Sequence, residues 1–166
     1  MHWSECHDEM KMADFLEQIT EEEKLRRFAL ELACTVLEEL KDQRLIDAVD
    51  ATENFLNGAI GESDLARFHT SAETAVEEIE AREMNDFKNG IEDAKMEYEK
   101  GLVVLYAAIP PSINHYRSSL EAARDSALHA AHYCRQIRGD DDLSKQMEIL
   151  VLVELPSNVT CRTSRG

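Results

Sequence analysis

Apolar residues recur at spacings of three and four from Leu25 to Ile137, and this period constrains the fold of the chain more than any other feature. Such spacing places side chains on one face of an α-helix, whereas a half-buried strand would require strict alternation. The positions between the apolar stripes carry many carboxylates, as expected for helices with one buried and one solvated side. The sequence therefore predicts an all-α protein, a helical bundle of about five to six helices.

Boundary signals mark the start of the first long helix. Residues 1–12 are polar, and we expect them to form either a loosely docked arm or a short first helix. Thr20 and Glu23 have the spacing of a capping box, in which each side chain binds a free backbone N–H at a helix N-terminus. The apolar stripe that follows predicts a helix from about residue 21 to residue 40.

The next two helices are bounded by a stop signal and a start signal. A stripe that begins at Leu45 ends at Asn57-Gly58, two residues that tolerate the left-handed conformation after a helix C-terminus. Ser63 is the expected N-cap of the following helix. The apolar pattern changes phase at residues 80–83, so we expect a separate helix whose seam runs from Met84 to Ala108.

Two later segments are expected to form a long antiparallel helical hairpin around Pro110-Pro111, because proline cannot continue a helix. Asn89-Gly90 would interrupt the first helix of this hairpin as a kink or a short break. Ser112 is the expected N-cap of the second helix, which has a heptad-like stripe from Ile113 to Ile137. Small residues on both seams would let the two backbones approach closely.

The C-terminal part of the chain has no clear helical period. Residues 147–155 are β-branched and apolar, which leaves helix and strand both open, although a lone strand would lack a sheet partner. We therefore favour a short buried helix there. The sequence predicts one helical domain over residues 1–155 and a disordered polar tail over residues 156–166.

The chain is strongly acidic. It contains 34 acidic and 18 basic residues, which gives a formal net charge of −16. Phosphate binding depends on lysine and arginine, so this charge disfavours direct binding of nucleic acid, and it disfavours anionic membranes for the same reason. It favours a basic protein surface or a nucleic-acid-binding protein as the partner. The alternative is that the charge only keeps the protein in solution.

The four cysteines are widely spaced and form no CxxC pair: Cys6, Cys34, Cys134 and Cys161. Cys34 and Cys134 fall on helix faces that should be buried, where a free thiol behaves as a small apolar group. The N-terminus has no signal-peptide pattern, and no apolar run approaches the roughly 18 residues that a membrane span requires. We therefore expect reduced cysteines and a cytoplasmic protein.

Motifs for catalysis and cofactor binding are not recognisable in the sequence. Gly58-Ala59-Ile60-Gly61 lacks the lysine and the preceding strand of a phosphate-binding loop, so we expect no cofactor and no enzymatic activity. The best metal candidate is Asp125, His129 and His132, whose spacings of four and three place them on one helix face. A di-iron bundle would need Glu-x-x-His pairs on two helices, and the sequence has none. We predict no metal, with this group as the alternative.

Acidic residues are concentrated between Glu73 and Glu99, where ten carboxylates face only three bases. On a helix, these carboxylates would be spread over roughly 40 Å at about 1.5 Å per residue. The cluster is the best interaction surface that the sequence offers, although each carboxylate taken singly is typical of a solvated helix face. The candidate partner-binding residues are Glu73, Glu77, Glu78, Glu80, Glu83, Asp86, Glu92 and Asp93.

The N-terminal part of the chain also carries a recognisable series: Lys24-Leu25-Arg26-Arg27-Phe28-Ala29, Ala33-Cys34, Asp42-Gln43-Arg44, Ala48-Val49, Glu53-Asn54-Phe55 and Gly58. This series resembles a helical bacterial family of immunity proteins of polymorphic toxin systems, and related helical proteins of planctomycete-type genomes. The similarity covers roughly residues 1–66. It implies a helical scaffold and an immunity role, and it carries no site residue over to this chain.

Taken together, these features predict a non-enzymatic acidic protein that inhibits or neutralises a macromolecular effector, as an immunity-type inhibitor does. Three alternatives remain open. The first is a phage-type anti-defence protein that blocks a nucleic-acid-binding groove. The second is a structural homodimer or assembly module, and the third is a metal-binding helical enzyme.

Overall fold

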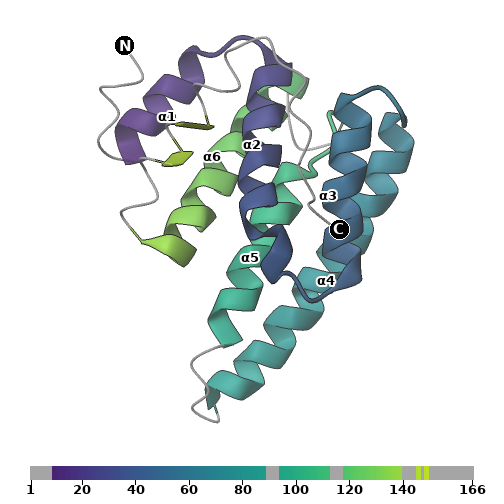
Figure 1. Ribbon diagram of the computed structural model, residues 1–166, viewed down its shortest axis with the longest axis vertical. Coiled ribbons are helices and arrows are strands. Elements are labelled where there is room, and N and C mark those ends of the chain that lie inside the picture. The colour runs from purple at the N-terminus through teal and green to yellow at the C-terminus, as the bar shows by residue number, and fades with distance from the viewer. Residues whose placement is uncertain (1–8, 89–93, 113–117, 140–144, 147, 150–166) are drawn as a thin grey trace.

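The computed structural model describes residues 9–88, 94–112, 118–139, 145–146 and 148–149, and every element in these ranges is helical. The helices pack against each other as a bundle, which confirms the predicted all-α class (Figure 1). In chain order they are α1 (Glu9–Gln18), α2 (Glu22–Val36), the 3₁₀ turn η2 (Leu37–Glu39), α3 (Gln43–Leu56), α4 (Glu62–Lys88), α5 (Ala94–Ala107) and α6 (Ser119–Arg138).

Residues 9–12 belong to the short first helix α1, while residues 1–8 lie outside the described residues. Helix α1 buries Phe15 and Leu16 against the core. The predicted capping box at the start of α2 is wrong, because the N-cap residue is Glu21 and no side chain caps the helix. The carboxylates of Glu22 and Glu23 instead lie in the first turn, where the positive end of the helix dipole favours negative charge.

Helix α3 ends where the sequence predicts and begins two residues before its apolar stripe. Its N-cap Asp42 accepts a hydrogen bond from the backbone N–H of Arg44. The helix ends at Leu56 and is followed by Asn57 and by Gly58, which has a φ of 73°. The left-handed conformation expected from the Asn-Gly pair is therefore present at its second residue.

Helix α4 is longer than the sequence predicts and passes through residues 80–83 without a break. It begins at Glu62, so Ser63 lies in its first turn and does not precede it. The buried face continues from Val76 and Ile79 to Glu83, with helical spacing throughout. A carboxylate occupies the last of these positions, which is why the apolar pattern seemed to change phase there.

The predicted hairpin around Pro110-Pro111 is formed by α5 and α6, which pack against each other. Its first helix is shorter than expected, because residues 84–88 belong to α4 and not to α5. The N-cap of α6 is Ser118, whose hydroxyl accepts from the Glu121 N–H at 3.1 Å. Ser112 does not cap it; its own N–H donates to Glu62 of α4 at 2.6 Å. Asn89-Gly90 lies outside the described residues.

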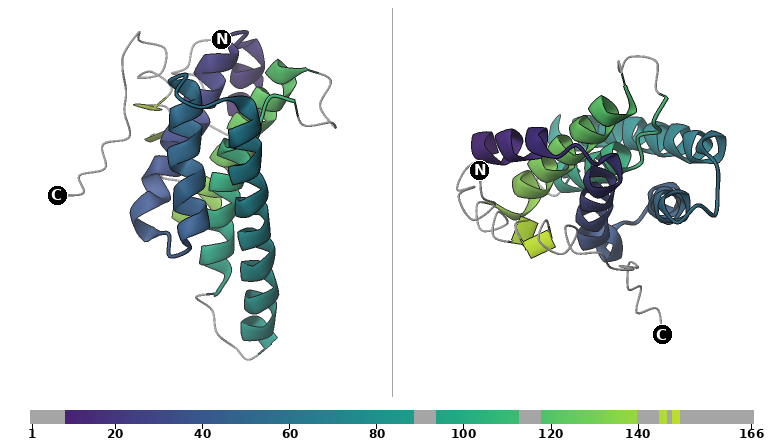
Figure 2. Two further views of the ribbon diagram at one scale, coloured as in Figure 1. Left: turned by 90° about the vertical axis from the view of Figure 1, so that its right-hand side faces the viewer. Right: turned by 90° about the horizontal axis from the view of Figure 1, so that it is seen from above.

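Helix α5 packs against α2, α3, α4 and α6, and helix α2 packs against α3, α5 and α6, while α1 packs on α6 (Figure 2). The face of α6 that enters the core is rich in alanine, so the helices can approach closely. Helices α4 and α5 are also close, because a Cβ built on Gly101 would lie 3.0 Å from Cγ2 of Val76. The alanine-rich face of α6 and the short distance at Gly101 both agree with the expectation that small residues let the helices approach closely.

The two described cysteines differ in chemical state. Cys134 is a fully buried thiol, as expected, and its Sγ donates to the backbone oxygen of Leu32 at 3.8 Å. The expectation of a free buried thiol is wrong for Cys34, which is only half-buried and is disulfide-bonded. Cys34 lies at the edge of the α2 stripe, beside the core positions Ala33 and Val36.

The end of the chain lies largely outside the described residues. Lys145, Gln146, Glu148 and Ile149 are helical, while most of residues 147–155 and the predicted tail 156–166 are not described. Gln146 is buried and donates a hydrogen bond to the backbone oxygen of Ala131 at 2.9 Å. None of the helices in the described ranges is long and apolar enough to cross a membrane.

Candidate functional site

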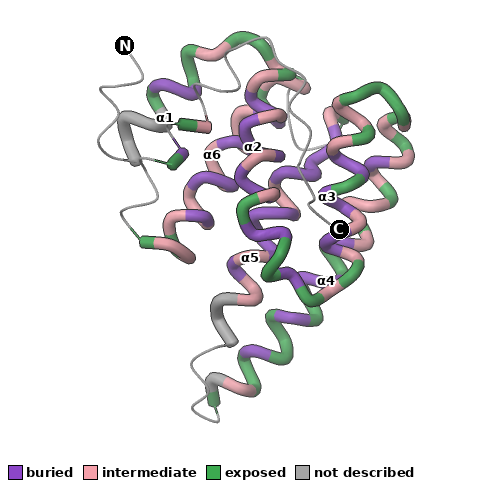
Figure 3. Tube along the Cα trace, in the orientation of Figure 1, coloured by how far each residue is buried: buried purple, intermediate pink, exposed green. Residues whose placement is uncertain are grey.

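Helices α4 and α5 run side by side in opposite directions, and their paired ends extend beyond the rest of the bundle (Figure 2). We call residues 79–88 of α4 and 94–99 of α5 the distal arm. On the outer side of α4, Glu73, Glu77 and Glu80 are exposed at helical spacings of four and three. We call these three residues the acidic stripe. Figure 3 shows that exposed positions alternate with buried ones along α4.

The next position along the acidic stripe is Met84, four residues after Glu80. The predicted seam places Met84 in the core, whereas its exposed fraction is 57%. An exposed large apolar side chain next to carboxylates can act as an anchor in a protein interface, because burying it against a partner removes apolar surface from water. Met84 was missed as a surface residue because a local pattern cannot show which face of a helix has a neighbour.

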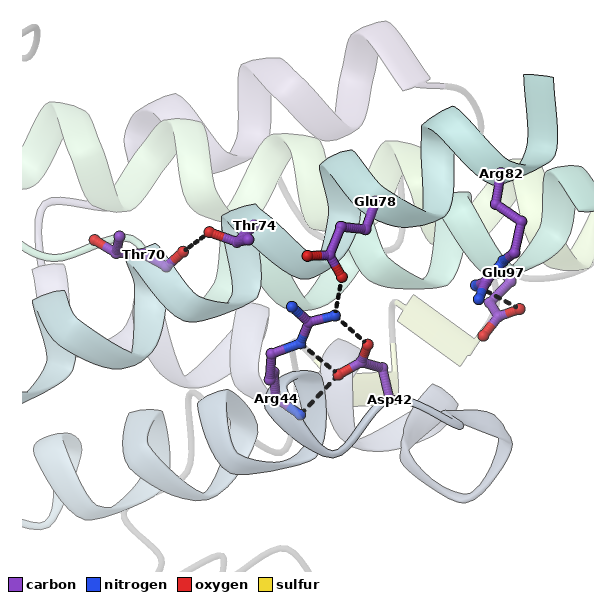
Figure 4. A network of polar contacts seen from close by, with 7 residues as sticks. All are labelled: Asp42, Arg44, Thr70, Thr74, Glu78, Arg82 and Glu97. Atoms are coloured by element: carbon purple, nitrogen blue, oxygen red, sulfur yellow. Dashed lines mark hydrogen bonds and ion pairs between the residues drawn. The ribbon is translucent and has the colours of Figure 1, made fainter. Parts of the chain in front are cut away.

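Glu78, another predicted site residue, is held by an arginine of α3. The Nη2 atom of Arg44 lies 2.6 Å from a carboxylate oxygen of Glu78 and 2.8 Å from one of Asp42 (Figure 4). The hydrogen bonds from Arg44 lower the pKa of both carboxyl groups below their usual values. Glu78 therefore links α4 to the start of α3, and its charge is partly neutralised within the fold.

Glu83 is not on the surface. It is 8% exposed, and its Oε1 accepts a hydrogen bond from the backbone N–H of Tyr98 at 2.9 Å. Burial raises the pKa of Glu83, and the nearby carboxylate of Glu97 raises it further, against the lowering effect of that hydrogen bond. This residue belongs to the packing between α4 and α5 and cannot contact a partner in this arrangement.

The remaining predicted carboxylates contribute less to an exposed surface. Asp86 is half-buried, and Glu92 and Asp93 lie outside the described residues. Arg82 adds an exposed cation to the arm, 3.6 Å from a carboxylate oxygen of Glu97 (Figure 4). The structure thus brings three of the eight predicted residues together as exposed, aligned carboxylates on α4, and gives intramolecular roles to Glu78 and Glu83. Glu80 has a place in both groups, because its carboxylate also forms a side-chain hydrogen bond with Tyr98 of α5.

The three candidate metal ligands on α6, which the sequence offers only as an alternative to no metal, are engaged in other contacts. Nδ1 of His129 lies 3.0 Å from a carboxylate oxygen of Asp125 and 2.9 Å from its backbone oxygen. The His129 ring stacks on Tyr106 of α5, with centroids 4.4 Å apart, and His132 lies edge-on to Tyr133. Among the residues that the structure describes, no group of three histidine, cysteine or acidic side chains is arranged to hold a metal ion.

These histidines instead belong to an aromatic contact between α5 and α6. The Tyr106 ring stacks on both His129 and Tyr133, with its centroid 5.7 Å from that of Tyr133. Burial raises the pKa of Tyr106 and makes its phenol a weaker acid, which does not favour proton transfer near neutral pH. The spacing of four residues between His129 and Tyr133 was a signal for this stacking, because such residues share a helix face.

Comparison with protein-family models, with curated proteins and with solved structures finds no match to this chain.

Proposed function

We propose that this protein is a non-enzymatic acidic binding protein that inhibits or neutralises a macromolecular effector with a basic surface, in the manner of an immunity protein. The observation that supports the proposal is the acidic stripe of Glu73, Glu77 and Glu80 with Met84 at its end, on an outer face of α4. The resemblance of residues 1–66 to helical immunity proteins points in the same direction.

The stripe has the two components that a protein interface uses. Its carboxylates would attract a basic partner over a distance set by the ionic strength, which increases the rate of encounter. Met84 would supply apolar contact area at the end of the stripe. A net charge of −16 adds to the attraction for any cationic effector.

The test begins with affinity capture of partners from the native host and purification of one captured protein. The double substitution Glu73→Lys and Glu77→Lys should weaken binding of that protein and reduce its dependence on salt, because two attractive charges become repulsive. A matched control is Glu38→Lys with Asp50→Lys, which changes the net charge equally at exposed positions of η2 and α3. The proposal fails if both double variants bind equally well.

A second candidate is an anti-defence protein that occupies a nucleic-acid-binding groove. It is favoured by the linear arrangement of the acidic stripe, whose carboxylates span about 10 Å at about 1.5 Å per residue. Competition separates the two candidates. Nucleic acid should displace this protein from its target if the groove is the binding site, whereas an immunity-type contact elsewhere on the effector would be insensitive to added nucleic acid.

A further inference from the structure

The pairing of α4 with α5 contains a carboxyl group at a position that an apolar side chain would normally fill. Glu83 continues the buried side of α4 after Val76 and Ile79, and it is 8% exposed. Its Oε1 atom accepts a hydrogen bond from the Tyr98 N–H of α5 at 2.9 Å. The contact therefore joins the last turns of α4 to the first turns of α5, within the distal arm.

The charged groups around Glu83 do not compensate for its burial. From its own helix, Arg82 faces it, but this guanidinium is exposed and also lies 3.6 Å from Glu97. From α5, two further carboxylates face it: Glu97, and Glu99, which is itself 8% exposed. An ionised Glu83 is thus poorly solvated and close to two like charges.

The third element packed on α4 contributes charges that are already engaged elsewhere. At the start of α3, Asp42 and Arg44 form their ion pairs with each other and with Glu78, one turn and more before Glu83. Arg44 therefore forms an ion pair with Glu78, and the charged groups that act on Glu83 come from α4 and α5.

We propose that Glu83 makes the α4–α5 pairing of the distal arm sensitive to protons: the arm tightens when Glu83 is protonated and loosens when it is ionised. A protonated carboxyl group loses its desolvation cost and its repulsion from Glu97 and Glu99, while its carbonyl oxygen still accepts from the Tyr98 N–H. This inference does not depend on the partner proposed above, since it concerns the arm itself.

The direction of the effect follows from the pKa of Glu83, which burial raises above the ordinary value of 4.5. The folded arm then binds a proton more readily than the unfolded chain does, so its stability falls as the pH rises through the raised pKa. The full contribution of protonated Glu83 to the stability of the arm is present below pH 4.5. The pKa values of Asp42 and Glu78 are lowered, so their contribution to stability is lost as the pH falls. A measurement of global unfolding would therefore combine this loss with the opposite effect of Glu83.

A local measurement isolates the arm. Hydrogen exchange of residues 80–88 and 97–103 would be measured at about pH 7.5 and about pH 5, with each rate divided by the rate of the unfolded peptide. In the unmodified protein, protection of the Tyr98 amide should increase several-fold at the lower pH. Glu83→Gln, whose amide oxygen can still accept from Tyr98, should be strongly protected at both pH values.

The matched control is Glu77→Gln, which removes an exposed carboxylate from the same helix and should keep the pH dependence of the unmodified protein. The proposal is overturned if Glu83→Gln and Glu77→Gln show the same pH dependence, or if protection of the arm decreases on acidification. The protection of residues 45–56 of α3 should not change with the protonation of Glu83 or with its replacement by Gln. This comparison separates opening of the arm from unfolding of the whole bundle.

Discussion

At the scale of single residues, Arg26 shows how one side chain can join distant parts of the chain. Its side chain is 4% exposed, and Nη1 donates a hydrogen bond to the backbone oxygen of Ile109 at 2.6 Å. Nε donates to Glu22 at 2.9 Å. The Ile109 carbonyl follows the last turn of α5, just before Pro110, so Arg26 satisfies a buried acceptor that a helix end leaves free.

Replacing Arg26 should therefore destabilise the protein more than replacing its neighbour in the sequence. Arg26→Met keeps an apolar stem but leaves the Ile109 carbonyl buried without its donor, and it should lower the free energy of unfolding by about 1–3 kcal/mol. Arg27→Met removes an exposed pair with Glu23 and should cost about 0.5 kcal/mol or less. Urea denaturation followed by circular dichroism measures both, and equal losses would show that the buried contact adds no net stability.

At the scale of secondary-structure elements, the end of α3 depends on a residue with an unusual backbone preference, Gly58. Gly58 has a φ of 73°, in the left-handed region where a Cβ is unfavourable. It follows α3 and reverses the chain toward α4, so its conformation sets how these two packed helices are connected. Gly61 lies three residues later and does not have a positive φ.

These two glycines allow backbone strain to be measured separately from crowding. A Cβ built at either position meets no atom within 4 Å, so neither substitution to alanine is limited by space. Gly58→Ala should lower the free energy of unfolding by about 1–2 kcal/mol, because alanine resists the left-handed conformation. Gly61→Ala should be neutral or slightly stabilising, because it restricts the unfolded chain. Thermal unfolding of the two variants tests this, and a similar loss in both would contradict it.

At the scale of the whole molecule, the dominant property is the excess of carboxylates over bases. A net charge of −16 produces self-repulsion that opposes the compact state. Ion pairs relieve it only in places, such as Glu39, which lies 2.6 Å from Nζ of Lys100 and 3.2 Å from Nη2 of Arg138. These contacts join η2 to α5 and α6.

Salt should therefore stabilise this protein. Raising NaCl from about 0.01 M to about 0.15 M shortens the screening length from about 30 Å to about 8 Å, and Tm should increase because repulsion among the carboxylates is reduced. Glu73→Gln with Glu77→Gln should give a smaller increase, since it removes part of that repulsion. Differential scanning calorimetry measures the change, and a Tm that decreases with salt would mean that ion pairs outweigh self-repulsion.

The sequence by itself determined the helical class, the ends of α3 and the hairpin around Pro110-Pro111. These features depend on local physics: the period of apolar residues, the left-handed tolerance of glycine and the inability of proline to continue a helix. The capping signals were less reliable. Thr20 and Ser112 are plausible N-caps by residue type, but α2 has Glu21 as its N-cap and α6 has Ser118. A polar side chain caps a helix only when it immediately precedes the first helical residue.

Only the tertiary structure decided what the polar residues of α4 do. Glu77, Glu78 and Glu83 are alike in sequence, yet one is exposed, one is paired with Arg44, and one is buried against α5. The exposure of Met84 and the disulfide at Cys34 also depend on neighbours. The physical reason is that burial and pairing are properties of two surfaces in contact, and a helical period specifies only one of them.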